Sequence, residues 1–297
     1  MNRKINGVLP LDKPLGLSSN EALQAVKKLF RAAKAGHAGS LDPKASGMLL
    51  ICFGEATKFS QFLLEANKRY LVTGKLGEIS ASGDGETEII SRREIGNVDK
   101  KRIEEVLVRF RGRISQLPTM YSALKHQGVP LYKLARQGLE VPREPREVEI
   151  FNLDLLKFED DYFFLDVVCS KGTYIRTLVV DIEEALGCGA RVAELRRLVV
   201  GGYTEDQMIS MVQLEELVAD GKDLGSLLLP LESMVSDLPE IILTPDMLYY
   251  ARRGNVLWVT NAPLSGMVRL KEKNGQFCGV GTVLNDGKIS PKKIIYS

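Results

Sequence analysis

The pattern of the chain changes at about Pro239, and this change constrains the fold more than any other feature. Before it, helical periodicities and alternating apolar segments are interspersed along the sequence. After it, short strand-like runs are separated by glycine-rich turns. Strands mixed with helices are typical of an α+β core, and about 60 residues suffice for a small domain that folds alone. The sequence therefore predicts a large α+β domain over residues 1–237 and a small β-rich domain over 238–297.

Several segments carry clear secondary-structure signals. The capping-box spacing of Ser18 and Glu21 predicts a helix that starts near residue 19 and continues to about residue 34. The glycine-rich segment after it, residues 36–43, has no period and predicts a rigid loop. The other expected elements are a strand over 69–76, a turn over 82–85, a helix over 98–110, a strand pair over 148–158 and 162–170, a helix over 174–186, and strands over 254–259, 266–270 and 279–283.

Two regions differ from the ordinary globular background. Residues 118–146 contain several prolines, many basic residues and two tyrosines, Tyr121 and Tyr132, which predicts a loop-rich insertion that could fold over a ligand. The acidic stretch 205–237 predicts solvated helices.

The net charge of +2 hides an uneven distribution along the chain. Residues 1–70 carry a net charge of +6 and residues 71–140 a net charge of +3. Residues 141–240 carry −12, and residues 241–297 carry +5. Two basic ends around an acidic middle indicate a polyanionic partner, although a count along the sequence does not locate a surface patch.

Composition and motifs exclude several classes of function. No run of 18 apolar residues exists, and charges and a proline interrupt the N-terminus too early for a signal peptide, so we expect a cytoplasmic protein without a membrane span. The four cysteines are far apart, and the two histidines, His37 and His126, leave almost no material for a metal site or a histidine-dependent nucleophile. No phosphate-binding glycine motif follows a strand. We therefore expect chemistry that uses carboxylate, arginine, lysine and tyrosine, without cofactor or metal.

Three short segments could carry such chemistry. Residues 36–47 place Asp42 in a glycine-rich loop beside His37, residues 67–70 form a basic cluster that ends in a tyrosine, and residues 170–178 read SKGTYIRTL. Each has an ordinary structural interpretation when taken alone. An Asp-Pro pair is typical of an Asx turn that caps the next helix, and basic residues at a strand end are usually solvated.

Taken together, these segments resemble the bacterial tRNA pseudouridine synthase family that modifies uridine 55 in the T-loop. The resemblance covers essentially the whole chain, and the matching segments occur in the same order. They are GVLPLDKPLGLSSNEAL, GHAGSLDPKASGMLLICFGEATKFSQFLLEANKRY, PTMYSALKHQGVPLYKLARQG, SKGTYIRTL and GCGARVAELRRLVVG. The resemblance implies a pseudouridine synthase fold, in which helices flank a mixed, largely antiparallel sheet. It also implies that the tail is a PUA-like RNA-binding domain and that 118–146 is a thumb-like insertion that grips RNA.

The resemblance also assigns three catalytic residues. Asp42 matches the essential aspartate, the nucleophile that acts on the flipped uridine so that the glycosidic bond moves from N1 to C5. Tyr70 matches the tyrosine that stacks on the target base and is implicated in proton handling. Arg176 matches the arginine that pairs with the aspartate. A guanidinium suits this pairing because it stays charged and can bind both carboxylate oxygens.

Five further positions match substrate-binding residues. Tyr174 and Leu195 match pocket residues, and His37 matches the histidine that reorganises the T-loop. Lys13 and Lys58 match basic positions near the site. A uridine in a folded T-arm must be extruded before chemistry, and Tyr70 and Leu195 would supply the apolar surface that replaces its lost stacking.

The expected protein is thus a monomeric, stand-alone enzyme that binds the T-arm stem-loop of tRNA without a guide RNA or protein partner. Two alternatives remain open. A guide-RNA-dependent pseudouridine synthase shares this catalytic domain, although the insertion at 118–146 favours the stand-alone enzyme. The second alternative is an RNA-binding or RNA-folding module. The presence of Asp42, Tyr70 and Arg176 together disfavours a purely binding role. Whether Asp42 attacks C6, attacks C1′ or abstracts a proton toward a glycal is left open.

The sequence departs from the usual family pattern at two places. Arg191 stands where histidine is frequent, and residues 78–86 read EISASGDGE where threonine and aspartate are more usual. Both lie outside the assigned catalytic set. We therefore expect them to affect contacts with RNA rather than activity.

Overall fold

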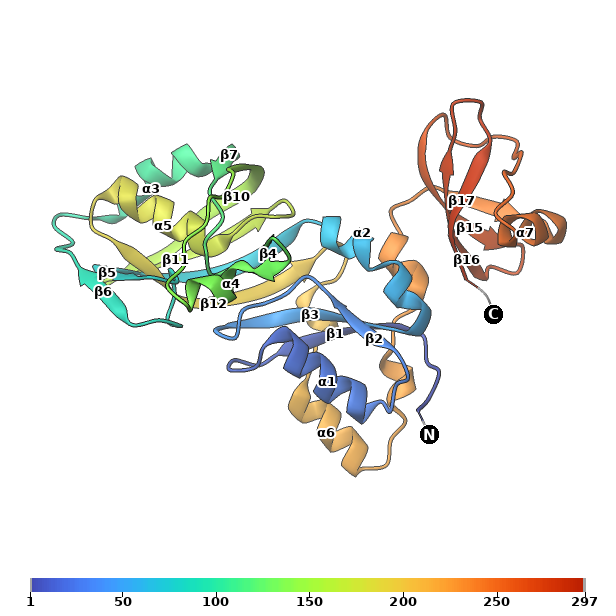
Figure 1. Ribbon diagram of the computed structural model, residues 1–297, viewed down its shortest axis with the longest axis horizontal. Coiled ribbons are helices and arrows are strands. Elements are labelled where there is room, and N and C mark those ends of the chain that lie inside the picture. Colours follow the sequence, from blue (N-terminus) through green and yellow to red (C-terminus); the bar gives the residue numbers. More distant parts are fainter. Residues whose placement is uncertain (1, 296–297) are drawn as a thin grey trace.

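One long mixed sheet organises the chain up to the C-terminal domain (Figure 1). The computed structural model describes residues 2–295, and within them this sheet has nine strands. They are β1 (Gly7–Lys13), β2 (Ala35–Ala38), β3 (Ala45–Phe53), β4 (Lys68–Leu76), β7 (Gly112–Gln116), β10 (Arg146–Glu159), β11 (Tyr162–Cys169), β12 (Ala190–Val200) and β13 (Ile209–Ser210). Their order is β13-β1-β3-β12-β4-β11-β10-β7, with β2 beside β3. Only β1 with β13 and β12 with β3 are parallel, so the expected mixed, largely antiparallel sheet is confirmed.

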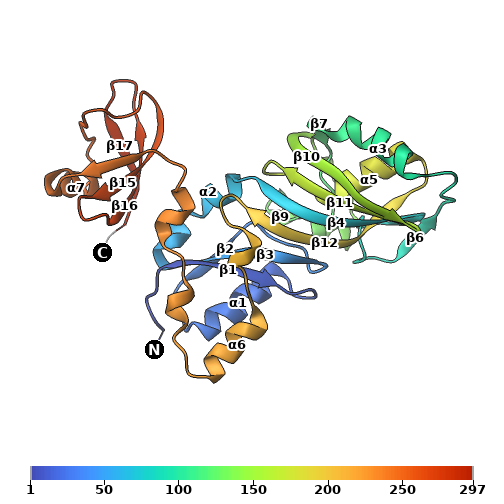
Figure 2. The same cartoon turned by 180° about the vertical axis from the view of Figure 1, so that it is seen from behind.

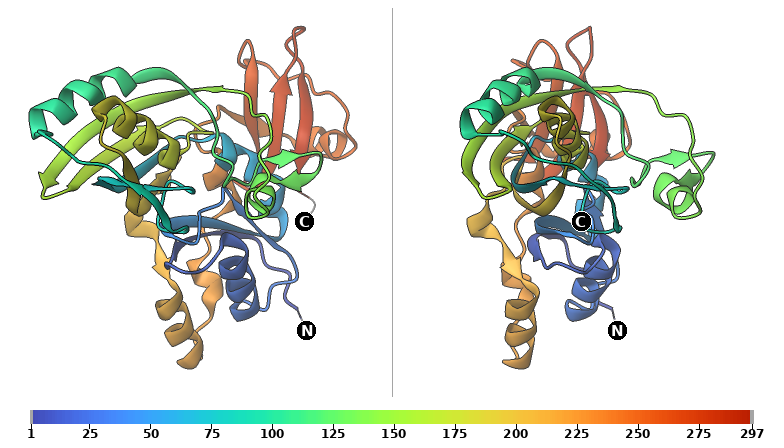
Figure 3. Two further views of the ribbon diagram at one scale, coloured as in Figure 1. Left: turned by 60° about the vertical axis from the view of Figure 1, so that its left-hand side comes forward. Right: turned by 90° about the vertical axis from the view of Figure 1, so that its left-hand side faces the viewer.

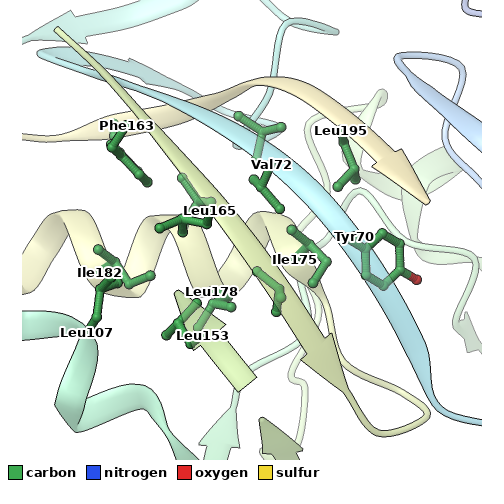
Figure 4. Packing of buried hydrophobic residues seen from close by; sticks show 14 of the residues in the cluster. Tyr70, Val72, Leu107, Leu153, Phe163, Leu165, Ile175, Leu178, Ile182 and Leu195 are labelled. Atoms are coloured by element: carbon green, nitrogen blue, oxygen red, sulfur yellow. The ribbon is translucent and has the colours of Figure 1, made fainter. Parts of the chain in front are cut away.

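Helices cover the two halves of the sheet separately. Helices α3 (Lys100–Leu107) and α5 (Ile175–Leu186) pack on the half formed by β4, β10, β11 and β12. Figure 4 shows the side chains of this core, with those of α5 lying against those of β4 and β11. Helices α1 (Ser19–Leu29) and α6 (Met211–Ala219) cover the half formed by β1 and β3. In the described chain, no helix is long and apolar enough to cross a membrane.

The first helix confirms its predicted start but not its predicted end. Ser18 and Glu21 form the capping box: the Ser18 hydroxyl accepts from the Glu21 amide, and the Glu21 carboxylate accepts from the Ser18 amide. The helix ends at Leu29 rather than near residue 34, because Arg31 adopts a left-handed conformation with φ of 49°. The chain then forms β2, so the predicted loop over 36–43 is wrong in its first part. A strand of four residues is too short to show a period in the sequence.

The predicted insertion is confirmed as a loop-rich segment between β7 and β10. We call residues 117–145 the insertion. It contains strands β8 (Lys125–His126) and β9 (Val129–Pro130) and helix α4 (Leu131–Ala135). In the right-hand view of Figure 3 this green segment projects away from the sheet. Its base is closed by Arg143, whose guanidinium donates to the Pro118 carbonyl at 2.9 Å.

The acidic stretch 205–237 is less helical than predicted. It contains the single α-helix α6 and three short 3-10 turns, η3 (Glu205–Gln207), η4 (Leu224–Leu227) and η5 (Leu231–Val235). Gly221, which has a positive φ of 70°, and Pro230 interrupt the segment. Both residues oppose helix continuation.

The C-terminal domain is a four-stranded sheet with one helix. Its elements are β14 (Glu240–Leu243), α7 (Pro245–Arg252), β15 (Gly266–Glu272), β16 (Phe277–Val283) and β17 (Ile289–Ile294). The strands predicted over 266–270 and 279–283 are confirmed. The strand predicted over 254–259 is wrong, because Leu257 alone forms a bridge, with Ile289, while Val256 and Trp258 are exposed. The alternation there reflects one buried side chain in a turn rather than a paired strand.

The C-terminal domain docks on the part of the chain that forms the nine-stranded sheet, opposite the α3 and α5 end (Figures 1 and 2). Helix α2 (Ser60–Glu65) and the turn η1 (Gly54–Lys58) meet it. The rings of Phe59 and Phe277 lie 5.5 Å apart, and Val280 belongs to the same buried cluster. The two parts therefore share an apolar core. The remaining short strands, β5 (Glu78–Ser80) and β6 (Ile89–Arg92), form a separate hairpin.

Candidate active site

A cavity of about 350 Å³ opens where the loop before β3 meets β4, β12 and the start of α5. Asp42 and Tyr70, from the loop and β4, lie on its lining. Tyr174, Arg176 and Leu195, from the α5 start and β12, lie there too. We call this the inner cavity. The structure therefore brings together five of the eight residues that the sequence nominated, although they lie up to 153 positions apart, from Asp42 to Leu195.

Backbone contacts hold the Asp42 loop in place. The Ser19 hydroxyl, at the first turn of α1, accepts from the Leu41 amide at 2.7 Å and donates to the Leu41 carbonyl at 2.9 Å. The Gly16 amide donates to the Pro43 carbonyl at 2.8 Å. The residue on each side of Asp42 is thus fixed to the α1 segment. Because both neighbours of Asp42 are hydrogen-bonded to the α1 segment, the loop holds the carboxylate in a fixed position.

Arg176 lies between two carboxylates. Its Nη2 is 2.8 Å from Asp42 Oδ2, and its Nε is 3.6 Å from Asp84 Oδ2. Arg176 also donates to the carbonyls of Ser82, at 3.1 Å, and Tyr121, at 2.6 Å. Its side chain is 5% exposed, whereas that of Asp42 is 38% exposed and faces the cavity. The guanidinium is therefore a fixed, buried charge that orients one accessible carboxylate.

Sequence reasoning missed Asp84. The turn over residues 82–85 was expected, but no chemical role was assigned to its aspartate. In the structure the Asp84 carboxylate accepts from the Ser82 hydroxyl at 2.6 Å and from the Glu86 amide at 2.8 Å. Both bonds are made to Oδ1, so Oδ2 of Asp84 is the oxygen that faces Arg176. An Asx turn next to Gly83 was the only sequence signal, and such turns are too common to identify a site.

The electrostatic surroundings act on Asp42 in opposite directions. Burial raises the pKa of Asp42 above its usual value. The Arg176 guanidinium opposes this rise, while the negative charges of Asp84 and Glu86 add to it. The carboxylate of Asp42 therefore has a raised pKa and a cation at contact distance, a combination that occurs at functional sites.

Tyr70 and Leu195 form the apolar part of the inner cavity. They lie on the neighbouring strands β4 and β12, where Leu195 pairs with Val72 and Arg197 pairs with Tyr70. Figure 4 shows both side chains at the same end of the core, beside Ile175. Burial raises the pKa of the Tyr70 hydroxyl. A flat aromatic ring facing an aliphatic side chain across a cavity is suited to hold a planar ring.

Tyr174 is the N-cap residue of α5 and connects the cavity to the base of the insertion. Its amide donates to Gln116 Oε1 at 3.0 Å, and its carbonyl accepts from Gln116 Nε2 at 3.3 Å. Gln116 is the last residue of β7. Burial raises the pKa of the Tyr174 hydroxyl.

His37 lies in a second cavity of about 680 Å³ on the other side of the Asp42 loop. We call this the outer cavity, and its lining shares Leu41 and Asp42 with the inner one. Burial lowers the pKa of His37, so the imidazole is neutral at neutral pH. On the insertion side, Arg136 forms a 2.6 Å ion pair with Glu86. The outer cavity therefore lies between the sheet and the insertion.

The two nominated lysines lie outside both cavities. Lys13 is fully buried behind the Asp42 loop, where its ammonium donates to the carbonyls of Pro14 and Leu17, each at 2.8 Å. Burial lowers the pKa of Lys13 to about 8, although Asp42 opposes the change. Lys58 contacts the C-terminal domain instead, since its ammonium donates to the Ile294 carbonyl at 3.2 Å. The expectation that Lys58 lies near the site is not met.

Two further basic residues line the inner cavity and were not nominated. Lys68 lies two positions before Tyr70 on β4, and Arg197 lies two positions after Leu195 on β12. Residues two apart on a strand lie on the same face of the sheet. Lys68 could therefore have been found from Tyr70, and Arg197 from Leu195. Burial lowers the pKa of Lys68 to about 8.

The two departures from the usual family pattern lie next to each other. Arg191 Nη2 is 2.8 Å from Glu78 Oε2, the first residue of the unusual 78–86 segment. The two positions therefore form one ion pair at the root of the β5 and β6 hairpin. Neither residue lines the inner cavity, but the 78–86 segment also contains Asp84, which contacts Arg176, so this departure does reach the candidate site.

Comparisons with known proteins agree with this arrangement. Residues 27–175 match the TruB family pseudouridylate synthase (N terminal domain), and residues 176–236 match the tRNA pseudouridylate synthase B C-terminal domain. Residues 239–295 match the C-terminal part of pseudouridine synthase II TruB.

Individual relatives extend over nearly the whole chain. The chain is 55% identical over 295 residues to the tRNA pseudouridine synthase B of Coxiella burnetii (strain RSA 493 / Nine Mile phase I), covering 99% of this chain and 96% of that protein. It is 50% identical over 302 residues to the protein of the same name from Yersinia pestis (strain Pestoides F), covering 99% and 93%.

Solved structures show the same fold. An H/ACA ribonucleoprotein bound to a substrate RNA containing 2'-deoxyuridine has a chain with a TM-score of 0.74 at 25% identity, covering 98% of this chain and 85% of that one. A Cbf5-Nop10-Gar1 complex gives a TM-score of 0.73 at 26% identity, covering 97% and 84%.

Proposed function

The chain belongs to the TruB family of pseudouridylate synthases, and we propose that it isomerises uridine 55 in the T-loop of tRNA without a guide RNA or protein partner. Enzymes of this family convert uridine to pseudouridine. In this proposal residues 1–237 form the catalytic domain and residues 238–297 a PUA-like domain that binds RNA. The enzyme acts as a monomer in the cytoplasm, where its tRNA substrate is found.

The observation that carries the proposal is the pairing of Asp42 with Arg176 beside the apolar faces of Tyr70 and Leu195. The isomerisation breaks the N1–C1′ bond, forms a C5–C1′ bond, moves a proton off C5 and places one on N1. No atoms are gained or lost. The uridine must leave the T-loop stack to react, and the Tyr70 ring supplies the surface on which it stacks.

Asp42 acts on this base as an ionised carboxylate. Attack at C6, attack at C1′ and proton abstraction toward a glycal all require the charged form. Arg176 stabilises that form at 2.8 Å, against the burial that raises the pKa of Asp42. A buried guanidinium suits this role because it stays charged and its donors are fixed by two carbonyls. Tyr70 lines the same cavity, and its hydroxyl is the proposed proton carrier.

The insertion supports a stand-alone enzyme over a guide-dependent one. It carries basic side chains next to the outer cavity, among them Lys125 and Arg136. His37 lies on the opposite side of that cavity. A T-loop seated there would place its extruded base toward Asp42, which lines both cavities. A chain with its own RNA-gripping wall does not need a guide RNA to position the substrate.

The experiment that tests the proposal maps pseudouridine in a defined RNA. Unmodified tRNA transcript is incubated with the purified full chain alone, and pseudouridine is located by carbodiimide labelling and primer extension. We expect one new modified position, uridine 55. A transcript with cytidine at position 55 is the matched control and should stay unmodified. An isolated T-arm stem-loop should also be a substrate.

Each contrary result identifies a different error. Modification at another uridine would refute the assigned site. Modification that appears only when a cell extract or guide RNA is added would refute stand-alone action. Tight tRNA binding without any modification would favour an RNA-binding or RNA-folding role.

A further inference from the structure

Arg197 occupies a central position beneath the inner cavity. On β12 it pairs with Gly47 of β3 on one side and with Tyr70 of β4 on the other. The side chain is 2% exposed. Gly47 lets β3 approach the Arg197 backbone closely, because a Cβ at position 47 would lie only 2.2 Å from the Arg197 carbonyl oxygen. Arg197 is therefore located between the strand that follows the Asp42 loop and the strand that carries Tyr70.

The guanidinium of Arg197 holds the backbone on both sides of Asp42. Its Nη2 donates to the Gly39 carbonyl at 3.0 Å and its Nη1 to the Ser40 carbonyl at 3.4 Å. Its Nε donates to the Met48 carbonyl at 2.7 Å. Three donors of one side chain thus reach the segment before Asp42 and the strand after it. A lysine could not satisfy this set, because its single ammonium cannot match the fork of a guanidinium.

The same guanidinium reaches the second group of the site. Arg197 lies directly opposite Tyr70 on the neighbouring strand, and its charge lowers the pKa of the Tyr70 hydroxyl against the effect of burial. Other ionisable groups face this region from the surrounding elements. They are Lys13 on β1, His37 on β2, Asp42 on the loop, Lys68 on β4 and Cys169 on β11.

Arg197 has no carboxylate partner among residues 2–295, since the acceptors of its hydrogen bonds are the carbonyls of Met48, Ser40 and Gly39. Moving a cation out of water without an anionic partner is unfavourable, and hydrogen bonds to carbonyls offset this cost only in part. Stability alone therefore does not account for an arginine at this position. Its neighbour Arg196 differs, because it points to the opposite face and binds both oxygens of Asp12 at 2.8 Å.

We propose that Arg197 is a positioning residue that fixes the Asp42 loop and the Tyr70 hydroxyl in one geometry for the chemical step. The inference rests on the proposed function, because it assigns Asp42 and Tyr70 to that step. Arg197 acts through these two groups. It lies below the stacking surface and contributes to the rate of isomerisation rather than to RNA affinity.

The first test separates rate from affinity. Single-turnover rates and dissociation constants on a T-arm stem-loop are measured for Arg197→Lys and Arg197→Met. A displacement of about 1 Å at a reacting group can cost about 100-fold in rate, and we expect a loss of about that size for both variants. The dissociation constants should stay within about threefold of the wild-type value. Arg196→Lys and Arg196→Met are the matched controls and should keep the wild-type rate.

The second test asks whether Arg197 acts through Tyr70. Arg197→Lys is combined with Tyr70→Phe, and the rates of both single variants and the double variant are compared. Because the two side chains form one unit, the double variant should lose clearly less than the product of the two single losses. Thermal melts show which variants fold. Lysine keeps the charge and an N–H donor group but not the fork of the guanidinium, so Arg197→Lys still provides the test if Arg197→Met does not fold.

Three results would overturn the inference. The first is a folded Arg197→Lys variant whose single-turnover rate stays within threefold of the wild type. The second is a loss of rate in Arg197→Lys that multiplies fully with the loss in Tyr70→Phe. The third is a loss of rate in Arg197→Lys that is matched by an equal loss of RNA affinity. None of these results affects the proposed function, which is tested on the wild-type chain alone.

Discussion

The two walls of the site are built in opposite ways. The sheet wall consists of Tyr70, Arg176, Leu195 and Arg197, all at most 9% exposed. The facing wall is the insertion, residues 117–145, in which only Pro118, Ser122 and Leu131 are buried. The sheet wall is held by ladder hydrogen bonds and buried ion pairs. The insertion has one five-residue α-helix and a two-stranded ribbon of two-residue strands.

This difference separates two physical requirements. Reacting groups must be held to within a fraction of an ångström, which a packed sheet with satisfied buried charges provides. A surface that encloses a folded RNA must instead present charge over a large area, which an exposed loop-rich segment provides. Arg176 connects the two walls, because the same Nη2 contacts Asp42 of the site and the Tyr121 carbonyl of the insertion. We therefore expect changes in the sheet wall to alter rate, and changes in the insertion to alter affinity.

The largest expected effect is that of Asp42→Asn. The amide cannot act as a nucleophile or base, so the single-turnover rate should fall by at least about 10³-fold while tRNA affinity is largely kept. Asp12→Asn is the matched control, since Asp12 also pairs with an arginine but outside the inner cavity. Pseudouridine formation by Asp42→Asn at a near wild-type rate would show that another group carries the chemistry.

Tyr70→Phe should have the next largest effect. The phenyl ring keeps the stacking surface, whereas loss of the hydroxyl removes the proposed proton carrier, so the rate should fall by about 100-fold with unchanged affinity. Quenched single-turnover assays and filter binding measure the two quantities. Tyr203→Phe, which removes a buried hydroxyl far from the cavity lining, is the control. An unchanged rate for Tyr70→Phe would eliminate any proton-transfer role.

Asp84→Asn should lower the rate by less, about 10- to 30-fold, because it loosens Arg176 without removing a reacting group. It should also change the pH profile. Activity requires ionised Asp42, so the rate falls as the pH drops through the pKa of Asp42. The charge of Asp84 raises that pKa, whereas Arg176 lowers it; Arg176 keeps its contact with Asp42 and two carbonyls in Asp84→Asn, so removal of the Asp84 charge should dominate and move the acid limb to lower pH. An acid limb that stays in place or moves upward would contradict this coupling. Asp166→Asn, which removes the partner of Arg69, controls for loss of a sheet ion pair.

The smallest expected effects lie in the insertion. If Arg136 contacts RNA phosphate as proposed, its ion pair with Glu86 competes with that contact; Glu86→Gln should then tighten T-arm binding by about threefold, and Arg136→Gln should weaken it by a similar factor. The chemical rate should not change. Filter binding at two salt concentrations measures both, and the salt dependence should be weaker in Arg136→Gln. A large rate loss in Arg136→Gln would remove the distinction between the two walls.

The helices and long strands were predictable because each shows its signal within a few residues. The capping box at Ser18, the left-handed Gly187 that ends α5 and the alternation of β10 and β11 are local features that the structure confirms. The missed strand β2 and the wrong strand at 254–259 have one cause. Short segments show no reliable period, and their state depends on which partner strand is available.

The sequence by itself identified the family and nominated Asp42, Tyr70 and Arg176 through the resemblance, because the matching motifs are long and local. Only the tertiary structure decided that Asp84 supports Arg176, that Lys58 belongs to the domain contact, and that Arg197 joins the Asp42 loop to Tyr70. Arg197 reaches carbonyls up to 158 positions away. Such contacts depend on the register of β12 against β3 and β4, which places a side chain beside partners that no local pattern connects.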